Sequence, residues 1–315
     1  MQRFRLWGAL IAAPALAAFL SLAGCSGEKE QPAAKKDTGS SVGPEAKGGG
    51  RPAVRGGARA PLVATGWGSL KGKVTFDGDP PPVEQIVIPD TVKEKDQCLA
   101  GDTRKQTWKV GPDKGVGDVA VWLRPTKGHY FQIPPDQQKP EPPVVKIDQP
   151  QCAFIPHVSA LFPSFFDSES KKQKPTGQVF EVVNSAGFNH NTKWDPSDTL
   201  VMLGANEILQ SKSNRKIDVK VSKDKDAGGE MLLKFSCNIH PWMSAFAWAF
   251  DHPYAAVSTG DAKDAKDFGN YEIKKVPAGV ELELVCWHET FKEKPKVLKT
   301  LTLKEGENTE DFKIK

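Results

Sequence analysis

The chain of 315 residues has no run of 18 or more apolar residues after its first 24 positions, which excludes internal transmembrane helices. Its main part also lacks an excess of charge, because residues 63–315 hold 34 Lys and Arg against 35 Asp and Glu. Nucleic-acid binding requires a clustered cationic face, so this balance argues against it. A nucleophile elbow, a phosphate-binding glycine loop, an HExxH pair and a CxxC motif are missing, which disfavours hydrolases and nucleotide-dependent enzymes.

Helical patterns are scarce as well. Glycine (28) and proline (25) make up about a sixth of the chain, and no long segment keeps a period of 3.6 residues. Short alternating apolar segments recur instead, bounded by Gly, Pro, Asp and Asn. The clearest lie at 70–76, 119–123, 144–147, 178–183, 217–221, 231–237, 271–273, 280–287 and 297–303. About fifteen candidate strands exceed the needs of one sandwich, so we predict an all-β protein with two β domains.

The N-terminus has the order of a secretory signal: Arg3 and Arg5, an apolar stretch, and small residues before Cys25. The sequence Leu-Ala-Gly-Cys at 22–25 resembles the bacterial lipobox. This resemblance implies that residues 1–25 are a lipoprotein signal peptide and that Cys25 is lipidated, anchoring the protein to the outer membrane or periplasmic face of the envelope. The alternative is an ordinary cleaved signal with an incidental cysteine.

Residues 26–62 are rich in Ala, Gly, Pro, Lys and Ser and have almost no large apolar side chain before Leu62. Such a composition cannot bury enough apolar surface to offset the entropy lost on ordering. We therefore predict a disordered linker over 26–62.

Two separated stretches resemble one small sandwich. The sequence Gly-Asn-Tyr-Glu-Ile at 269–273 is followed by Val-Pro-Ala-Gly at 276–279, and Gly-Lys-Val-Thr-Phe-Asp-Gly-Asp-Pro lies at 72–80. These motifs are similar to those of the carboxypeptidase-regulatory-like family, which has a transthyretin-like or Ig-like β-sandwich. We expect one smaller sandwich, residues 63–139 and 255–315, interrupted by a second domain, residues 140–254; a serial arrangement is the alternative.

The most informative segment is Cys237-Asn-Ile-His240-Pro-Trp-Met243. Alternation places Cys237 on the same strand face as Met231, Leu233 and Phe235, so its thiol points inward. A thiol, an imidazole and a thioether at three-residue spacing can bend around one ion, and these donors are of the type that selects copper. A second imidazole must come from elsewhere, and His190 follows a strong strand in the turn-rich stretch 183–191.

The two loops resemble those of cupredoxins. Residues 184–191, Asn-Ser-Ala-Gly-Phe-Asn-His-Asn, are similar to the first copper loop of plastocyanins, with Asn189 where that family has Pro. The Cys-x2-His-x2-Met spacing is similar to that of amicyanin. The resemblance implies a Greek-key cupredoxin sandwich over 140–254 with one type 1 copper site. His190, Cys237 and His240 would form the trigonal plane, and Met243 would be the weak axial ligand.

The same resemblance bears on function. No coordination position is left open for substrate, so copper oxidase activity is not expected and the protein is not predicted to be an enzyme. In cupredoxins the imidazole of the second loop commonly lies at the surface in an apolar patch, which Phe188, Pro241 and Trp242 would supply around His240. We expect one-electron transfer between redox proteins of the envelope. The alternatives are a carbohydrate- or protein-binding module with a non-redox cupredoxin-like domain, and copper storage or delivery.

The remaining cysteines and histidines receive other roles. Cys98 and Cys152 lie near predicted strand ends in an exported protein, so we expect a disulfide between them. Cys286 alternates with Leu282 and Leu284 and should be a buried, inert thiol. His157 is expected to be structural. His252 and the His288-Glu289 pair could line the domain interface or form a minor second metal site.

Overall fold

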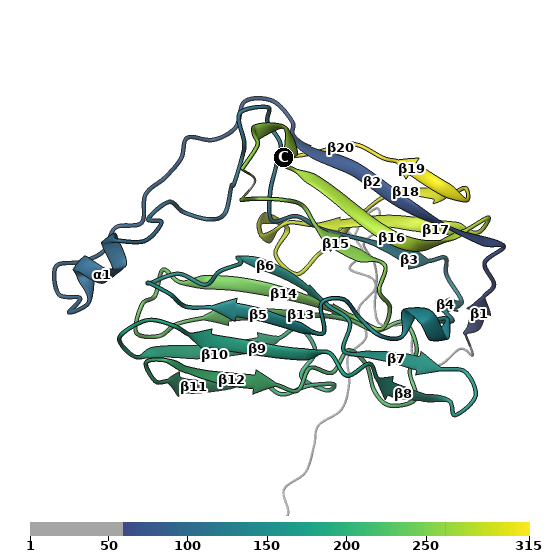
Figure 1. Ribbon diagram of the computed structural model, residues 1–315, viewed down its shortest axis with the longest axis horizontal. Helices are drawn as coiled ribbons and strands as arrows, with labels where there is room; N and C mark the ends of the chain where they lie inside the picture. The colour runs from purple at the N-terminus through teal and green to yellow at the C-terminus, as the bar shows by residue number, and fades with distance from the viewer. Residues whose placement is uncertain (1–58, 262) are drawn as a thin grey trace, which may run out of the picture. The chain divides into compact units, whose positions relative to one another are not determined.

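The computed structural model describes residues 59–261 and 263–315 (Figure 1). The predicted signal peptide 1–25, Cys25 and residues 26–58 of the predicted linker lie outside the described residues. The last three residues of the predicted disordered linker form strand β1 (Ala60–Leu62), because they pair with residues 129–131. In the described part of the chain the backbone forms twenty strands, one α-helix and three short 3-10 helices, which confirms the all-β class. No helix in this part is long and apolar enough to span a membrane.

The first sandwich is built from strands that come before residue 139 and after residue 254. One sheet has the order β15-β3-β17-β18, and the other has the order β16-β2-β19, with β20 also pairing with β2. The strands of these two sheets are β2 (Gly66–Phe76), β3 (Ala120–Pro125), β15 (Ala255–Val257), β16 (Asn270–Ala278), β17 (Glu281–Trp287), β18 (Lys296–Thr302), β19 (Gly306–Thr309) and β20 (Phe312–Ile314). Leu70, Val74, Ile273, Leu284 and other side chains from both sheets fill its core.

The second sandwich is built from the middle of the chain. A five-stranded sheet in the order β11-β10-β13-β14-β6 faces a three-stranded sheet in the order β12-β9-β5. The strands are β5 (Val144–Asp148), β6 (Val158–Leu161), β9 (Val179–Asn184), β10 (His190–Pro196), β11 (Ala205–Leu209), β12 (Ser213–Ile217), β13 (Glu230–Ser236) and β14 (Ser244–Phe250). Its core contains Ile147, Phe180, Leu233 and Phe235.

Short elements complete the described chain. Two small sheets pair β1 (Ala60–Leu62) with β4 (His129–Phe131), and β7 (Ser164–Asp167) with β8 (Lys172–Pro175). The 3-10 helices are η1 (Pro135–Gln137), η2 (Ala265–Asp267) and η3 (Glu289–Phe291).

One predicted strand is shorter than expected. The alternation over 217–221 predicts a strand there, but β12 ends at Ile217. Its partner β9 begins at Val179, and Ile217 is already opposite Phe180, so the residues beyond have almost no strand to pair with. Val219 and Val221 remain buried in the core, which explains why the alternation persists past the end of the strand.

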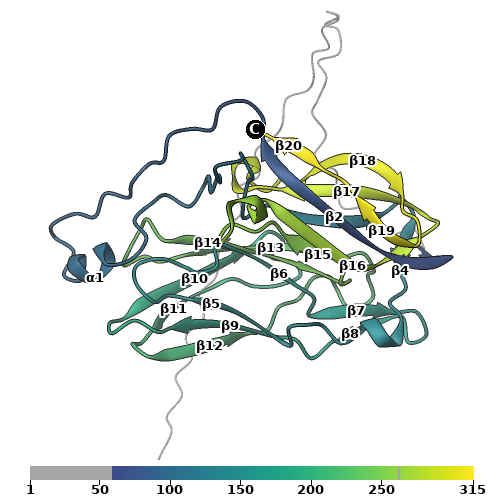
Figure 2. The same cartoon turned by 45° about the horizontal axis from the view of Figure 1, so that its top comes forward.

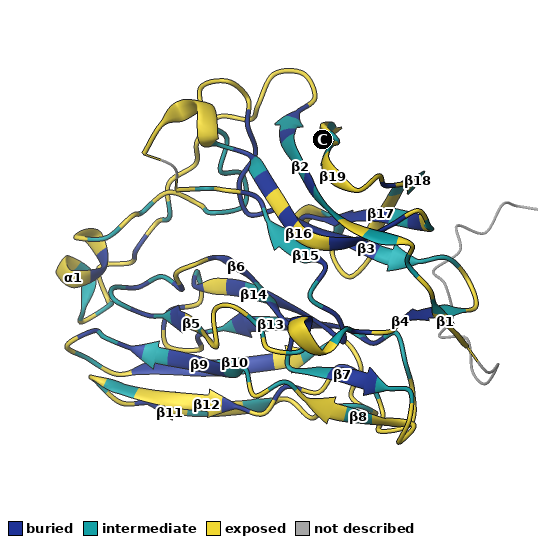
Figure 3. Ribbon diagram, turned by 45° about the vertical axis from the view of Figure 1, so that its right-hand side comes forward, coloured by how far each residue is buried: buried dark blue, intermediate teal, exposed yellow. Residues whose placement is uncertain are grey.

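The two sandwiches share a third apolar cluster. β14 and β6 lie on the side of the second sandwich that is nearer to β3 and β15 of the first (Figures 1 and 3). β14 sends Ala245, Ala247 and Ala249 into the core of the second sandwich, and its opposite face, including Trp248 and Phe250, meets Trp122 of β3 and Trp287 of β17. β14 is therefore apolar and largely buried on both faces. Strands of this kind read as continuous apolar runs.

A bidentate ion pair joins the sandwiches beside this cluster. The guanidinium of Arg124 donates to Glu230 from Nε (2.7 Å) and Nη2 (2.6 Å), and the indole Nε1 of Trp122 donates to the same carboxylate (3.1 Å). Arg124 lies on β3 and Glu230 on β13, so the contact crosses from one sandwich to the other. The fork geometry of the guanidinium fixes direction as well as distance.

A long excursion between β2 and β3 reaches the second sandwich. It carries the short helix α1 (Lys95–Leu99) to one end of that sandwich, beside the ends of β6 and β14 (Figures 1 and 2). Ile86, Ile88, Val92 and Cys98 pack against the core of the second sandwich. We call residues 86–98 the cover segment.

Truncating Trp248 should destabilise the protein strongly. Its ring is 4 % exposed and lies 5.0 Å from the ring centroid of Trp122 and 5.8 Å from that of Trp287. We expect Trp248→Ala to lower the free energy of unfolding by about 3–5 kcal/mol, because it leaves a large cavity between the sandwiches. Urea denaturation measures the change. The matched control is Trp67→Ala, at a ring that is 40 % exposed, and an equal loss in both variants would contradict this account of the interface.

Candidate metal centre

Cys237 comes from the end of β13. The strand ends at Ser236, and Cys237 continues the inward face formed by Leu233 and Phe235, all in the core of the second sandwich. The chain then turns through His240, whose carbonyl oxygen accepts a hydrogen bond from the Met243 N–H (2.9 Å), and β14 starts at Ser244. The three predicted ligands of this segment therefore lie on one tight loop between paired strands.

His190 comes from the start of β10, which pairs antiparallel with β13. The register places Lys193 opposite Ser236, so His190 lies beside the loop that follows β13. The preceding loop is held by Asn184, which is fully buried and donates from its amide to the carbonyl oxygens of Phe188 (2.9 Å), Leu209 (2.9 Å) and Gln210 (3.0 Å). One amide therefore fixes the path of the chain that leads to His190.

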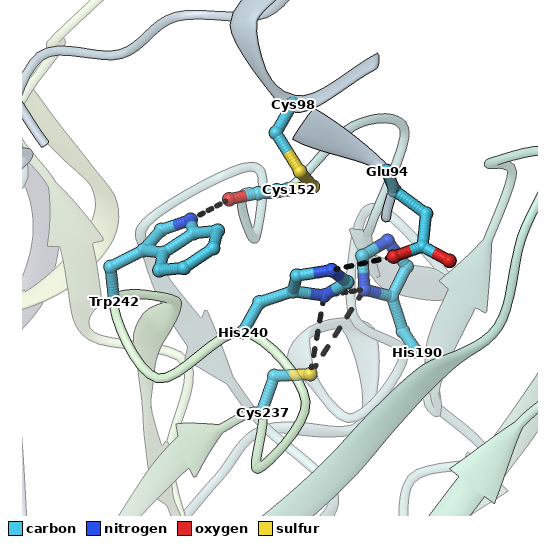
Figure 4. Close-up of a disulfide and its surroundings, with 7 residues drawn as sticks. All are labelled: Glu94, Cys98, Cys152, His190, Cys237, His240 and Trp242. Atoms are coloured by element: carbon cyan, nitrogen blue, oxygen red, sulfur yellow. Dashed lines mark hydrogen bonds and ion pairs between the residues drawn. A yellow bond between two sulfur atoms is a disulfide. The ribbon is translucent and has the colours of Figure 1, made fainter. Parts of the chain in front are cut away.

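The three donor atoms converge (Figure 4). The Sγ of Cys237 lies 4.0 Å from the Nδ1 of His190 and 3.8 Å from the Nδ1 of His240, and the two Nδ1 atoms are 3.1 Å apart. Two donors that each bind one ion at 2.0–2.3 Å can be at most about 4.5 Å apart. All three separations satisfy this limit, so the cluster can hold a single metal ion.

The cluster is closed to water. His190 and His240 are 0 % exposed and Cys237 is 2 % exposed, and the Cys237 sulfur is not in a disulfide. Burial lowers the pKa of His190 to about 4, with a further contribution from the His240 imidazole. Burial also lowers the pKa of His240, against the opposing effect of the Glu94 carboxylate. Both imidazoles are therefore neutral near pH 7 and can offer a lone pair to a metal.

Asn191 fixes the sulfur and both loops. Its backbone N–H donates to the Cys237 Sγ (3.3 Å), and its side-chain oxygen accepts from the Asn238 N–H (2.8 Å). Its amide nitrogen donates to the carbonyl oxygen of Glu207 on β11 (3.1 Å). Contacts of this outer shell orient ligands and tune a metal site. Sequence reasoning assigned no role to Asn191, although it directly follows the predicted ligand His190.

Met243 is also placed at the cluster's end of the sandwich. Its side chain is 2 % exposed and belongs to the same apolar core as Cys237. It also lines a cavity of about 250 Å³ together with Trp242, Cys152, Phe154 and residues of the excursion between β2 and β3. The Met243 side chain is thus almost fully shielded from solvent, which is compatible with a weak axial ligand to a soft metal.

The expectation that His240 lies at the protein surface is wrong. The imidazole is 0 % exposed because the cover segment, the Cys98–Cys152 disulfide and the half-buried side chains of Phe188 and Trp242 surround it. The Trp242 indole Nε1 donates to the Cys152 carbonyl oxygen (3.1 Å), and only Pro241 of the expected docking patch is exposed. An internal segment thus occupies the space that a docking partner would use.

The structure also shows where the remaining cysteines and His157 lie. Cys98 and Cys152 are joined in a disulfide. Cys286 is fully buried, as expected of an inert thiol, and burial raises its pKa to about 12. His157 lies between the Ser244 carbonyl oxygen (Nδ1, 3.0 Å) and Glu289 (Nε2, 3.3 Å), and this places it in a structural contact between the sandwiches.

The minor second metal site, one of the two alternatives for His252 and the His288-Glu289 pair, does not form among the described residues. The groups of His, Cys, Asp and Glu close enough to hold a metal there are His190, Cys237 and His240, and Cys98, Cys152 and His240. Neither includes His252, His288 or Glu289. His288 stacks on Trp108 at 4.1 Å between ring centroids, and His252 lies among Phe131, Phe250 and Tyr254.

Sequence reasoning missed Glu94. Its Oε2 lies 4.0 Å from the Nε2 of His240, and its side chain is 31 % exposed (Figure 4). The only local signal was its position four residues before Cys98, whose pairing with Cys152 brings this stretch to the site. The contact between Glu94 and His240 depends on the long excursion between β2 and β3 of the first sandwich. No periodic pattern in the sequence indicates where such an excursion packs.

Comparison with known proteins gives little more. No family model matches the chain, and no curated protein matches it. Among solved structures it is similar to a chain described as a novel purple cupredoxin from Nitrosopumilus maritimus, with 12 % identity and a TM-score of 0.21 over 33 % of this chain and 98 % of that chain. A similarity at this level does not bear on function.

Replacing Asn184 should weaken the fold at the site. We expect Asn184→Asp to lower the free energy of unfolding by about 1–3 kcal/mol, because a carboxylate cannot donate to the three carbonyl oxygens that the buried Asn184 amide contacts. Denaturation of the apoprotein measures this. The control Asn214→Asp makes the same change at an exposed position of β12 and should cost far less. Equal stability of the two variants would show that the Asn184 amide does not hold the loop.

Proposed function

We propose that the protein is an exported, lipid-anchored type 1 copper protein that transfers single electrons between redox partners of the cell envelope. The observation that carries the proposal is the convergence of one thiol and two neutral imidazoles, through Sγ and two Nδ1 atoms, in a buried cluster. His190, Cys237 and His240 would hold the copper, with Met243 as the weak axial ligand. The first sandwich, with its carboxypeptidase-regulatory-like resemblance, would carry this domain at the membrane.

The donor set fits copper better than other common metals. Thiolate and thioether favour soft ions, imidazole suits copper, and a trigonal set of two His and one Cys with a distant Met is the electron-transfer arrangement. When bound, copper would supply a one-electron couple. The residues contribute fixed positions: Asn191 holds the sulfur, Asn184 holds the loop before His190, and the paired strands β10 and β13 hold both loops.

Fixed positions favour electron transfer over bond-making chemistry. A ligand set held by strands and buried hydrogen bonds changes little when the charge of the ion changes, so little rearrangement accompanies gain or loss of an electron. Four protein ligands would also leave no position for a substrate, unlike catalytic metal sites. This is why we propose no copper oxidase activity.

Copper storage or delivery is the second candidate, and the burial of His240 favours it. A redox partner usually approaches a copper protein through an exposed ligand edge, whereas here the cover segment lies over His240. Voltammetry and stopped-flow reduction of the copper-loaded protein discriminate between the two. Fast, reversible one-electron cycling supports electron transfer, and slow cycling with ready transfer of the metal to a chelating acceptor supports delivery.

Loss of the Cys237 thiol should abolish the coloured centre. We expect the wild-type apoprotein to bind one Cu(II) with intense visible absorption and a narrow copper hyperfine splitting in its electron paramagnetic resonance spectrum. Cys237→Ser should remove both signals and weaken binding by more than about 100-fold, since loss of an outer-shell partner alone costs 10–100-fold. Cys286→Ser, at the buried inert thiol, is the matched control. Retention of the colour in Cys237→Ser would refute the ligand assignment.

Loss of the Met243 thioether should change the potential without removing the centre. Met243→Leu keeps the buried volume and the three nearer donors, so we expect copper and its colour to remain. The reduction potential should rise, because the axial donor that helps to stabilise Cu(II) is gone and its surroundings become more apolar. Voltammetry of the two proteins measures the shift, and an unchanged potential would place Met243 outside the coordination sphere.

A further inference from the structure

The outward edge of His240 faces a second set of donors. Its Nδ1 points to Cys237 and His190, while its Nε2 is buried and has no hydrogen-bond partner among the described residues. A ring nitrogen of His240 and the sulfurs of Cys98 and Cys152 all lie within 4.8 Å of one another (Figure 4). All three residues are buried. An unpartnered nitrogen beside two sulfurs is unusual in a closed core, since buried polar atoms are normally hydrogen-bonded.

We propose that Cys98, Cys152 and the Nε2 of His240 form a second metal site when the disulfide is reduced, and that this site takes Cu(I). Two thiolates are soft ligands, and together with an imidazole they make a three-donor set. Structural zinc sites almost always use four protein ligands, and Glu94, the nearest carboxylate, does not belong to this group. Zinc held by three protein ligands takes a water as its fourth ligand, whereas all three residues here are buried. The three-donor set therefore favours Cu(I) over Zn²⁺.

The chemistry of the switch balances with a dithiol reductant. Two electrons and two protons from the dithiol break the S–S bond and give two thiols, while the reductant becomes a disulfide. Binding of Cu(I) then displaces the two thiol protons and leaves the oxidation state of copper unchanged. Because disulfide sulfurs are poor ligands and thiolates are strong ones, the site exists only in the reduced protein.

The second site would share one residue, His240, with the candidate centre. His240 belongs to both donor groups, with Nδ1 on one side and Nε2 on the other, so the two sites would be neighbours across a single imidazole. The Glu94 carboxylate lies 4.0 Å from this Nε2 and is partly exposed. It is therefore the negative charge that a cation entering from solvent would meet beside the site. The same disulfide ties the cover segment to Cys152, so reduction would both create the site and loosen what buries it.

The test uses the full chain with Cys237→Ser, which removes the candidate centre and leaves the second site. The protein is reduced with a phosphine, freed of reductant without air, and titrated with Cu(I) against bicinchoninate. We expect reduction to add one tightly bound Cu(I) per chain relative to the oxidised protein. The triple variant C98S/C152S/C237S should gain none, which also accounts for the thiols of Cys25 and Cys286. No gain on reduction, or an equal gain in the triple variant, would overturn the proposal.

Two further measurements test whether the variants fold and which metal the site prefers. Far-UV circular dichroism shows whether each variant is folded, and if Cys237→Ser does not fold, wild-type protein should still gain one Cu(I) on reduction whereas C98S/C152S should not. A parallel titration with Zn²⁺ checks the metal, and tighter Zn²⁺ than Cu(I) binding would overturn the copper assignment. The proposed function fails separately, through absence of colour in the oxidised wild-type protein, because that measurement uses Cys237 with the disulfide intact.

Discussion

This end of the protein is organised around a buried cluster of one thiol and two imidazoles, which the surrounding chain holds in place. Neutral rings placed 3.1 Å apart through their Nδ1 atoms must share a proton or face a common cation. Their positions are set from outside the cluster, by the Asn184 amide behind one loop and the Asn191 backbone N–H at the sulfur. The protein therefore stabilises an arrangement of donors that would gain little from each other alone.

The rest of the molecule depends on strands buried on both faces. β14 follows the metal-loop residue Met243 directly, and its two faces belong to different cores. β3 and β17 do the same from the other sandwich. A shift of one sandwich relative to the other would therefore displace β14, which directly follows the candidate metal loop. The ion pair between Arg124 and Glu230 adds a directional contact to this apolar interface.

Local patterns predicted the parts of the structure that local chemistry determines. Alternation gave the inward direction of Cys237, because side-chain direction in a strand has a period of two. The three-residue spacing correctly predicted that His240 and Met243 lie on the same loop as Cys237. The end of β12 at Ile217 could not be predicted, since it depends on where its partner begins. The cover segment could not be predicted either, because its packing against the core of the second sandwich and the approach of Glu94 to His240 follow no repeating pattern in the sequence.

The cover segment changes what the cupredoxin-like motifs imply. Spacing alone suggests an exposed imidazole that meets a partner directly, but a buried His240 leaves Ile239 and Pro241 as exposed neighbours in the same loop. A partner that approaches this loop would meet the side chains of Ile239 and Pro241 before it reached the Cys237 sulfur. Exclusion of water from all three donors lowers the local dielectric and strengthens every interaction among them. Burial of the cluster therefore hinders the docking of a partner at His240 and protects the Cys237 thiol from solvent.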